Sequence, residues 1–141
     1  MQITHQADYA VRTILYLSQL EPNRRVPTNE IARFNQIPPS FLTKIISQLA
    51  IAGLIHTSRG ARGGVWLAKP PENISLLDVL QAIDGTLSLN PCVENPQDCS
   101  FTQNCLIHKF WQDTCQEIVG KLRNSTFDQF KKEAELQPEL A

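Results

Sequence analysis

The chain has 141 residues, and its 13 Lys and Arg nearly balance its 14 Asp and Glu, for a formal net charge of −1. This length suits one compact domain or two small coupled units, and the longest apolar runs are too short to cross a bilayer. The first residues show no basic segment followed by an apolar run. We therefore expect a soluble cytoplasmic protein with reduced thiols and no membrane partner.

The charge is distributed unevenly along the chain. Residues 1–70 carry eight basic and three acidic side chains, a net +5, whereas residues 71–141 carry five and eleven, a net −6. Phosphate binding depends on local positive charge, so the nearly neutral total does not argue against a nucleic-acid partner. The basic half is the candidate DNA-binding part.

The first half predicts a helix-turn-helix. Apolar residues at three- and four-residue steps predict a helix over 4–20, and Thr28 is the expected N-cap of a short helix over about 29–35. After a tight turn, Pro39 suits the first position of a helix that runs to about Ala52. Two short helices joined in this way form the helix-turn-helix motif.

The second helix of such a motif enters the major groove of DNA. Its outward side chains here are polar or basic, and such groups hydrogen-bond base edges or reach phosphates. The candidate DNA contacts on this helix are Ser40, Thr43, Lys44, Ser47 and Gln48.

A basic hairpin follows. Two β-prone runs over 54–58 and 65–68 flank a segment with three glycines, and Arg59 and Arg62 lie at its tip. We interpret it as a wing that places these arginines in the adjacent minor groove. Ser75 and Asp78 form a capping pair for a helix over 76–84, which ends the predicted winged helix-turn-helix domain of residues 1–85.

The acidic half divides into three segments. We expect a cysteine-bearing loop over 86–104, a long amphipathic helix over 105–123 and a partly disordered tail over 124–141. The fold class is therefore mainly α with a small β-hairpin. One apolar stripe runs along the long helix: Ile107, Trp111, Cys115, Ile118 and Leu122.

Three cysteines lie in or next to this loop with the spacing Cys92-x6-Cys99-x5-Cys105, and His108 follows. Cysteines gathered on a polar loop indicate metal binding or redox chemistry. Thiolates suit iron–sulfur clusters and zinc, but the spacing is wider than the paired Cys-x2-Cys of structural zinc sites. If the helix begins at Cys105, then His108 shares its face.

Five motifs in register resemble the IscR/NsrR family of bacterial winged-helix regulators, across residues 1 to about 122. They are Met1-Gln2-Ile3-Thr4, Asp8-Tyr9-Ala10-Val11, Arg59-Gly60-x-x-Gly63-Gly64, Ile74-Ser75-Leu76-x-Asp78-Val79 and the three-cysteine loop. The resemblance implies a homodimer that binds a two-fold, palindromic operator in double-stranded DNA. The long helix over 105–123 would be the dimerisation helix, and its apolar stripe the candidate dimer interface. It also implies an iron–sulfur cluster on the three cysteines that switches DNA affinity.

The fourth cluster ligand has two candidates. His108 is similar to the IscR pattern, in which histidine ligates a two-iron cluster. Asp8 is similar to the NsrR pattern, in which an aspartate of the partner's first helix completes a four-iron cluster. The chain carries both residues, so the cluster type stays open between 2Fe–2S and 4Fe–4S.

These observations predict a homodimeric transcription regulator, and we expect a repressor. Its cluster would sense nitric oxide, redox state or iron–sulfur status. The alternatives are a DNA-binding regulator switched by cysteine oxidation or zinc, and a cluster-carrying redox protein with no DNA role. No enzyme is expected, because the glycines of 60–64 lack the Lys-Ser/Thr of a phosphate-binding loop.

Overall fold

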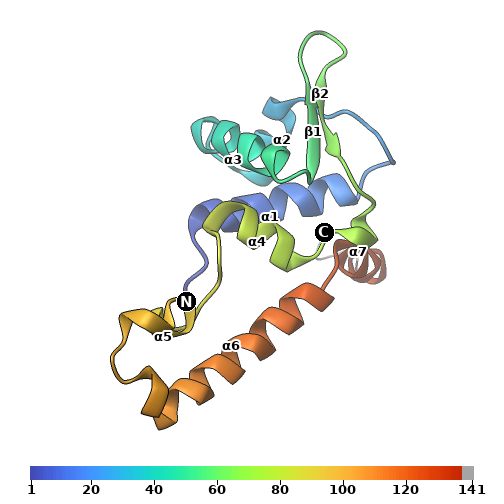
Figure 1. The fold of residues 1–141 in the computed structure, drawn as a ribbon. Coiled ribbons are helices and arrows are strands. Elements are labelled where there is room, and N and C mark those ends of the chain that lie inside the picture. Colours follow the sequence, from blue (N-terminus) through green and yellow to red (C-terminus); the bar gives the residue numbers. More distant parts are fainter. Residues whose placement is uncertain (138–141) are drawn as a thin grey trace.

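The computed structural model describes residues 1–137, which are mainly helical with one antiparallel hairpin (Figure 1). The helices are α1 (His5–Ser18), α2 (Thr28–Asn35), α3 (Pro39–Ile51), α4 (Leu76–Asp84), α5 (Pro91–Glu94), α6 (Leu106–Asn124) and α7 (Phe127–Leu136). The strands are β1 (Ile55–Ser58) and β2 (Gly64–Leu67), and 3-10 turns occupy Pro71–Asn73, Pro96–Asp98 and Thr102–Asn104. The expected fold class is confirmed.

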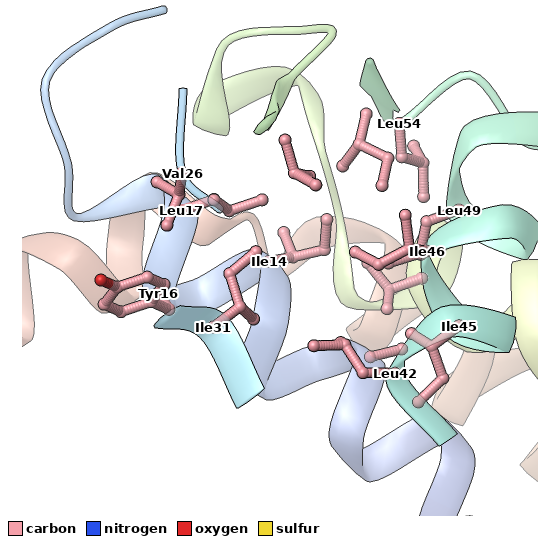
Figure 2. Packing of buried hydrophobic residues seen from close by; sticks show 14 of the residues in the cluster. Ile14, Tyr16, Leu17, Val26, Ile31, Leu42, Ile45, Ile46, Leu49 and Leu54 are labelled. Atoms are coloured by element: carbon pink, nitrogen blue, oxygen red, sulfur yellow. The ribbon is translucent and has the colours of Figure 1, made fainter. Parts of the chain in front are cut away.

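The core forms around α1, against which α2, α3, α4 and α7 pack (Figure 2). Its centre holds Ile14 of α1, Ile31 of α2, and Leu42 and Leu49 of α3, all fully buried. Burying each such side chain contributes roughly 1.5–3 kcal/mol. Residues 1–85 are here called the winged unit. This packing fixes the position of α3 within it.

Local capping explains where two helices begin. The Thr4 hydroxyl accepts a hydrogen bond from the Ala7 N–H at 3.1 Å and starts α1. Ser75 and Asp78 form the predicted reciprocal capping box at α4. The expected cap of α2 is wrong, because Thr28 is already its first helical residue. The N-cap is the extended Pro27, whose side chain makes no hydrogen bond.

The strands β1 and β2 pair from Ile55 opposite Leu67 to Ser58 opposite Gly64. A single further bridge joins Val26, in the segment between α1 and α2, to Val65 of β2. Within the wing, β2 therefore pairs with β1 and also with the segment just before α2.

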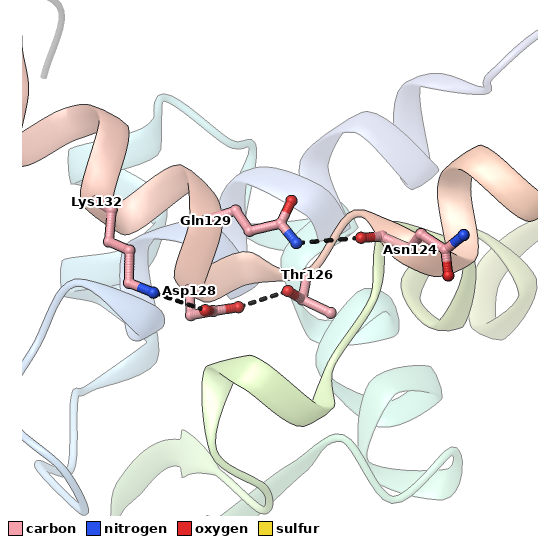
Figure 3. A network of polar contacts seen from close by, with 5 residues as sticks. All are labelled: Asn124, Thr126, Asp128, Gln129 and Lys132. Carbon is pink, nitrogen blue, oxygen red and sulfur yellow. Dashed lines mark hydrogen bonds and ion pairs between the residues drawn. The ribbon is translucent and has the colours of Figure 1, made fainter.

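Within the tail that the sequence predicts to be partly disordered, residues 127–136 form α7. Phe127 is fully buried, and its N–H donates to the Ile74 carbonyl at 3.1 Å. Thr126, Asp128 and Lys132 form a polar network at the start of the helix, and the Thr126 hydroxyl, with lesser help from Lys132, lowers the pKa of Asp128 (Figure 3). Residues 138–141 of the expected tail lie outside the described residues.

Residues 86–104, here called the cysteine loop, lie at the opposite end of the molecule from the wing (Figure 1). The long helix α6 runs from this loop back towards the winged unit, where α7 follows it. Among the described residues, no helix is both long and apolar enough to span a membrane.

Candidate DNA-binding face and cysteine loop

The helix α3 has one buried and one open face. Leu42, Ile45 and Leu49 are fully buried against the core, and this packing turns the polar residues between them outward. Of the predicted DNA contacts on α3, four are exposed: Ser40, Thr43, Lys44 and Ser47. They offer hydroxyl and ammonium groups along the face that would meet a DNA groove.

Gln48 differs from the other predicted contacts. It is half-buried, and its Oε1 atom is shielded from solvent without a hydrogen-bond partner among the described residues. Phe41, which the sequence analysis did not select, lies instead on the open side of α3. Its side chain is 42% exposed and packs edge-on against Tyr9, with ring centroids 6.0 Å apart. An apolar group here can contact a thymine methyl.

The wing lies beside this open face. Arg59 and Arg62 are exposed at its tip, where the Gly63 N–H donates to the Gly60 carbonyl at 2.9 Å. Side chains of α3 and the wing line one shared hollow of about 780 Å³, including Thr43, Ser47 and Arg59. The fold thus brings together the two elements that the sequence assigned to DNA binding.

A further arginine approaches the wing from outside the predicted set. The Arg25 guanidinium donates to the Arg62 carbonyl at 3.1 Å and lies 4.4 Å from the centre of the Trp66 ring. The only sequence signal was the basic pair Arg24-Arg25 in the turn after the first helix.

The three cysteines occupy successive irregular segments. Cys92 lies in α5, Cys99 follows the turn Pro96–Asp98, and Cys105 immediately precedes α6. All three are partly exposed free thiols. Pro91 begins α5, and Pro96 cannot donate the backbone hydrogen bond that would continue it, which favours the end of α5 at Glu94.

The two candidate fourth ligands have different surroundings. His108 lies in the first turn of α6, and its Nδ1 atom is buried with no hydrogen-bond partner among the described residues. Asp8 lies on α1 and pairs with Arg12 one turn later at 2.7 Å, with about half of each side chain exposed.

The chemistry of this donor set fits a cluster or a zinc ion. Free thiols and an imidazole nitrogen without a partner are the groups that such centres bind. Within the described part of this single chain, however, no three His, Cys, Asp or Glu side chains are close enough together to hold a metal ion. Binding would therefore require the cysteine loop to draw its thiols together.

The predicted stripe on α6 is only partly open. Cys115 is 5% exposed, and its thiol lies 3.4 Å from the Leu87 carbonyl of the same chain. Ile107 is exposed, as are two neighbours that the sequence analysis did not select, Leu106 and Phe110, at 97% and 56%. The uncovered apolar surface thus lies at the start of α6, next to the cysteine loop.

The chain matches a known family and known sequences over most of its length. The Rrf2 family model, described as an iron-dependent transcriptional regulator, matches residues 3–133. A helix-turn-helix-type transcriptional regulator of Aquifex aeolicus is 32% identical over 84% of this chain and 83% of its own length. The regulator IscR of Vibrio campbellii is 29% identical over 96% of this chain and 80% of its own.

Solved structures share the arrangement of elements. The structure of T. potens IscR superposes with a TM-score of 0.75 at 25% identity, covering 97% of this chain and 91% of that one. CymR, the global cysteine regulator of B. subtilis, gives a TM-score of 0.73 at 22% identity, covering 94% and 98%. At that identity, the likeness to CymR concerns the fold alone.

Proposed function

The chain belongs to the Rrf2 family of DNA-binding transcription regulators, and from this premise we propose that it is a homodimeric repressor of a palindromic operator, switched through its cysteine loop. One observation carries the proposal: the open face of α3 and the arginine-tipped wing line a single hollow. The relatives are transcriptional regulators, not enzymes.

DNA binding divides between the two elements of this face. The first turns of α3 enter the major groove, where Ser40 and Thr43 meet base edges and Lys44 reaches a base or a phosphate. The wing carries Arg59 and Arg62 to the neighbouring minor groove. The charge of +5 over residues 1–70 provides the attraction that does not depend on sequence.

Dimerisation would cover the apolar start of α6. Leu106, Ile107 and Phe110 leave at least half of their surface in water in the single chain, and an exposed apolar cluster of this kind marks an interaction surface. A two-fold dimer would present two α3 helices to two half-sites of an operator.

The switch is assigned to the cysteine loop. Cys92, Cys99 and Cys105 would bind an iron–sulfur cluster, with His108 or the partner's Asp8 as fourth ligand, and the bound cluster would supply a centre sensitive to nitric oxide and redox state. Because Cys105 directly precedes α6, drawing the thiols together would move the start of the dimer helix. The spacing of the two recognition helices would then change, and with it operator affinity.

A second switch is supported by a separate observation. The thiols of Cys92, Cys99 and Cys105 are free and partly exposed, so a small oxidant or a zinc ion can reach them. Oxidation of these thiols, or zinc binding, would act on the same loop. This alternative keeps the DNA-binding role and changes only the chemistry of the signal.

The DNA assignment is tested with the wing arginine. Arg59→Gln should weaken binding to an operator duplex selected from a random pool by about tenfold and reduce the salt dependence of the binding constant by about one ion. Arg123→Gln, which removes the same charge near the end of α6, should change neither by more than about twofold. Unchanged binding by Arg59→Gln would remove the wing from the DNA-binding face.

The cluster assignment is tested by anaerobic, iron-replete purification. The wild-type protein should contain iron and sulfide and absorb visible light. Cys99→Ser should lose both, whereas Cys115→Ala, which removes the buried thiol, should retain them. A protein that contains zinc alone, or binds no metal and changes operator affinity when its thiols are oxidised, would favour the second switch.

A further inference from the structure

The segment just before α2 forms a single β-bridge with the wing. The Val26 N–H donates to the Val65 carbonyl at 3.0 Å, and the Val65 N–H donates back to Val26 at 2.8 Å. Both valines are almost fully buried. The base of the wing is therefore fixed to the α1–α2 segment, on the edge of β2 that does not face β1.

A glycine allows this close approach. A side-chain carbon added to Gly64 would lie 2.9 Å from the Val26 nitrogen, and the Gly64 φ of +151° is one that other residues rarely adopt. The sequence thus keeps the start of β2 free of a side chain where the α1–α2 segment crosses it.

Arg25 extends this attachment from the base of the wing to its tip. Its guanidinium lies 4.4 Å from the centre of the Trp66 ring and donates to the Arg62 carbonyl at 3.1 Å. Trp66 in turn neighbours His56 across the hairpin, with ring centroids 5.7 Å apart. A planar guanidinium stacks on a ring and donates in its own plane at once, whereas an ammonium group does not.

The tip has few other restraints. Outside the strand ladder, the described residues provide two hydrogen bonds to residues 59–63, from the Gly63 N–H to the Gly60 carbonyl and from Arg25 to the Arg62 carbonyl. The first closes the turn on itself. Only the second connects the tip to the body of the winged unit.

We propose that Arg25 is a positioning residue that braces the wing, fixing the tip so that Arg59 and Arg62 are oriented for DNA before it binds. This inference rests on the proposed DNA-binding role of the wing. It assigns to Arg25 a role other than phosphate contact, because its ring-facing surface and one N–H group are already engaged within the protein. A pre-ordered tip loses less conformational entropy on binding.

The decisive variant is Arg25→Lys, which keeps the positive charge of the side chain but replaces the planar guanidinium with an ammonium group. Arg25→Lys and Arg25→Gln should both weaken binding to the selected operator duplex by a similar factor of about five to ten, which corresponds to one charge-assisted hydrogen bond. Neither should change the salt dependence of binding. The matched control is Arg24→Gln, which removes the same charge one residue earlier from a side chain that pairs with Glu30 at 3.6 Å, and it should change affinity by less than about twofold.

Two results would overturn the brace. One is wild-type affinity in Arg25→Lys together with a salt dependence lowered by about one ion in Arg25→Gln, because that pattern identifies a phosphate contact. The other is unchanged hydrogen exchange of the Gly63 amide, which donates to the Gly60 carbonyl, in DNA-free Arg25→Lys, where the brace predicts faster exchange at the tip. Thermal melting of each variant shows whether the fold itself is retained.

The failure of this inference is distinguishable from the failure of the proposed function. If Arg59→Gln binds the duplex like the wild type, then the wing does not contact DNA, and both proposals fail. If Arg59→Gln weakens binding while Arg25→Lys does not, then the wing assignment stands and only the brace is rejected. In the double variant Arg25→Gln/Arg62→Ala, the brace predicts a loss smaller than the product of the two single losses.

Discussion

The winged unit and the cysteine loop differ in how far their own side chains hold them in place. The winged unit surrounds α1 with fully buried residues such as Ile14 and Leu49, and its wing is attached at Val26. None of the residues 86–104, all of which the structure describes, is buried. The winged unit therefore has its core within one chain, whereas the loop has no core of its own and can be reshaped by whatever binds its thiols.

The largest expected effect is the difference in stability loss between truncating a core leucine and truncating a loop phenylalanine. Leu42→Ala should destabilise the protein by about 3 kcal/mol, because it leaves a cavity in α3 packing. Phe101→Ala should change stability by less than about 0.5 kcal/mol, since Phe101 is 75% exposed. Urea unfolding of the metal-free protein measures both. Equal losses would mean that the loop contributes to the core and that the contrast is false.

The four cysteines allow exposed thiols at the cysteine loop and a buried thiol on α6 to be compared within one molecule. In metal-free, reduced protein, a maleimide should label the partly exposed Cys92, Cys99 and Cys105 rapidly and the buried Cys115 more slowly. We expect a difference of roughly two orders of magnitude in rate, equivalent to about 2.7 kcal/mol of local opening. Mass spectrometry of peptides from a time course assigns each rate. Four similar rates would place Cys115 in a segment as open as the loop.

The sequence predicted those parts that depend on near neighbours. Ser75 and Asp78 lie three residues apart and cap α4 as expected, and the apolar spacing placed Leu42 inside α3. Both features are set within one or two helical turns, where residue preferences and periodicity act directly.

The parts that were missed depend on contacts between distant segments. Arg25 meets Arg62 across 37 positions, and α7 forms because Phe127 docks into the core beside Ile74. The uncovered surface of α6 is set by how the helix lies against the first residues of the cysteine loop, where the Leu87 carbonyl contacts the buried Cys115. No local pattern in a single sequence contains this information.

Two glycine-to-alanine substitutions compare how tightly the backbone is packed in the wing and in α6. Gly64→Ala should destabilise the protein by about 2 kcal/mol, because an added carbon meets the Val26 backbone at a φ that alanine disfavours. Gly120→Ala in α6 should stabilise it by about 0.5–1 kcal/mol, since nothing lies within 4 Å of the added carbon and alanine favours a helix. Opposite signs in thermal melting are the expected result. A stabilising Gly64→Ala would show that the wing base tolerates a wider separation.

The smallest effect concerns a polar contact between α1 and α2. The Tyr16 hydroxyl donates to Glu30 at 2.8 Å, and burial, followed by this hydrogen bond, raises the pKa of Tyr16 above its ordinary value of 10.0. The folded state therefore holds this proton more tightly than the unfolded state does. The contribution of the protonated Tyr16 hydroxyl to stability is complete below pH about 10. It is lost as the pH rises through the pKa that Tyr16 has in the folded protein.

Tyr16→Phe should remove this part of the alkaline decline in the free energy of unfolding, while costing about 1 kcal/mol at neutral pH through the lost hydrogen bond to Glu30. Glu30→Gln keeps an acceptor but removes the negative charge, so it should move the pKa of Tyr16 back towards 10.0. Urea unfolding between pH 8 and 11 and absorbance of the tyrosinate follow the two effects separately. An alkaline decline of the same steepness in Tyr16→Phe would mean that this contact is open to water, and that this part of the winged unit is no more firmly held than the loop.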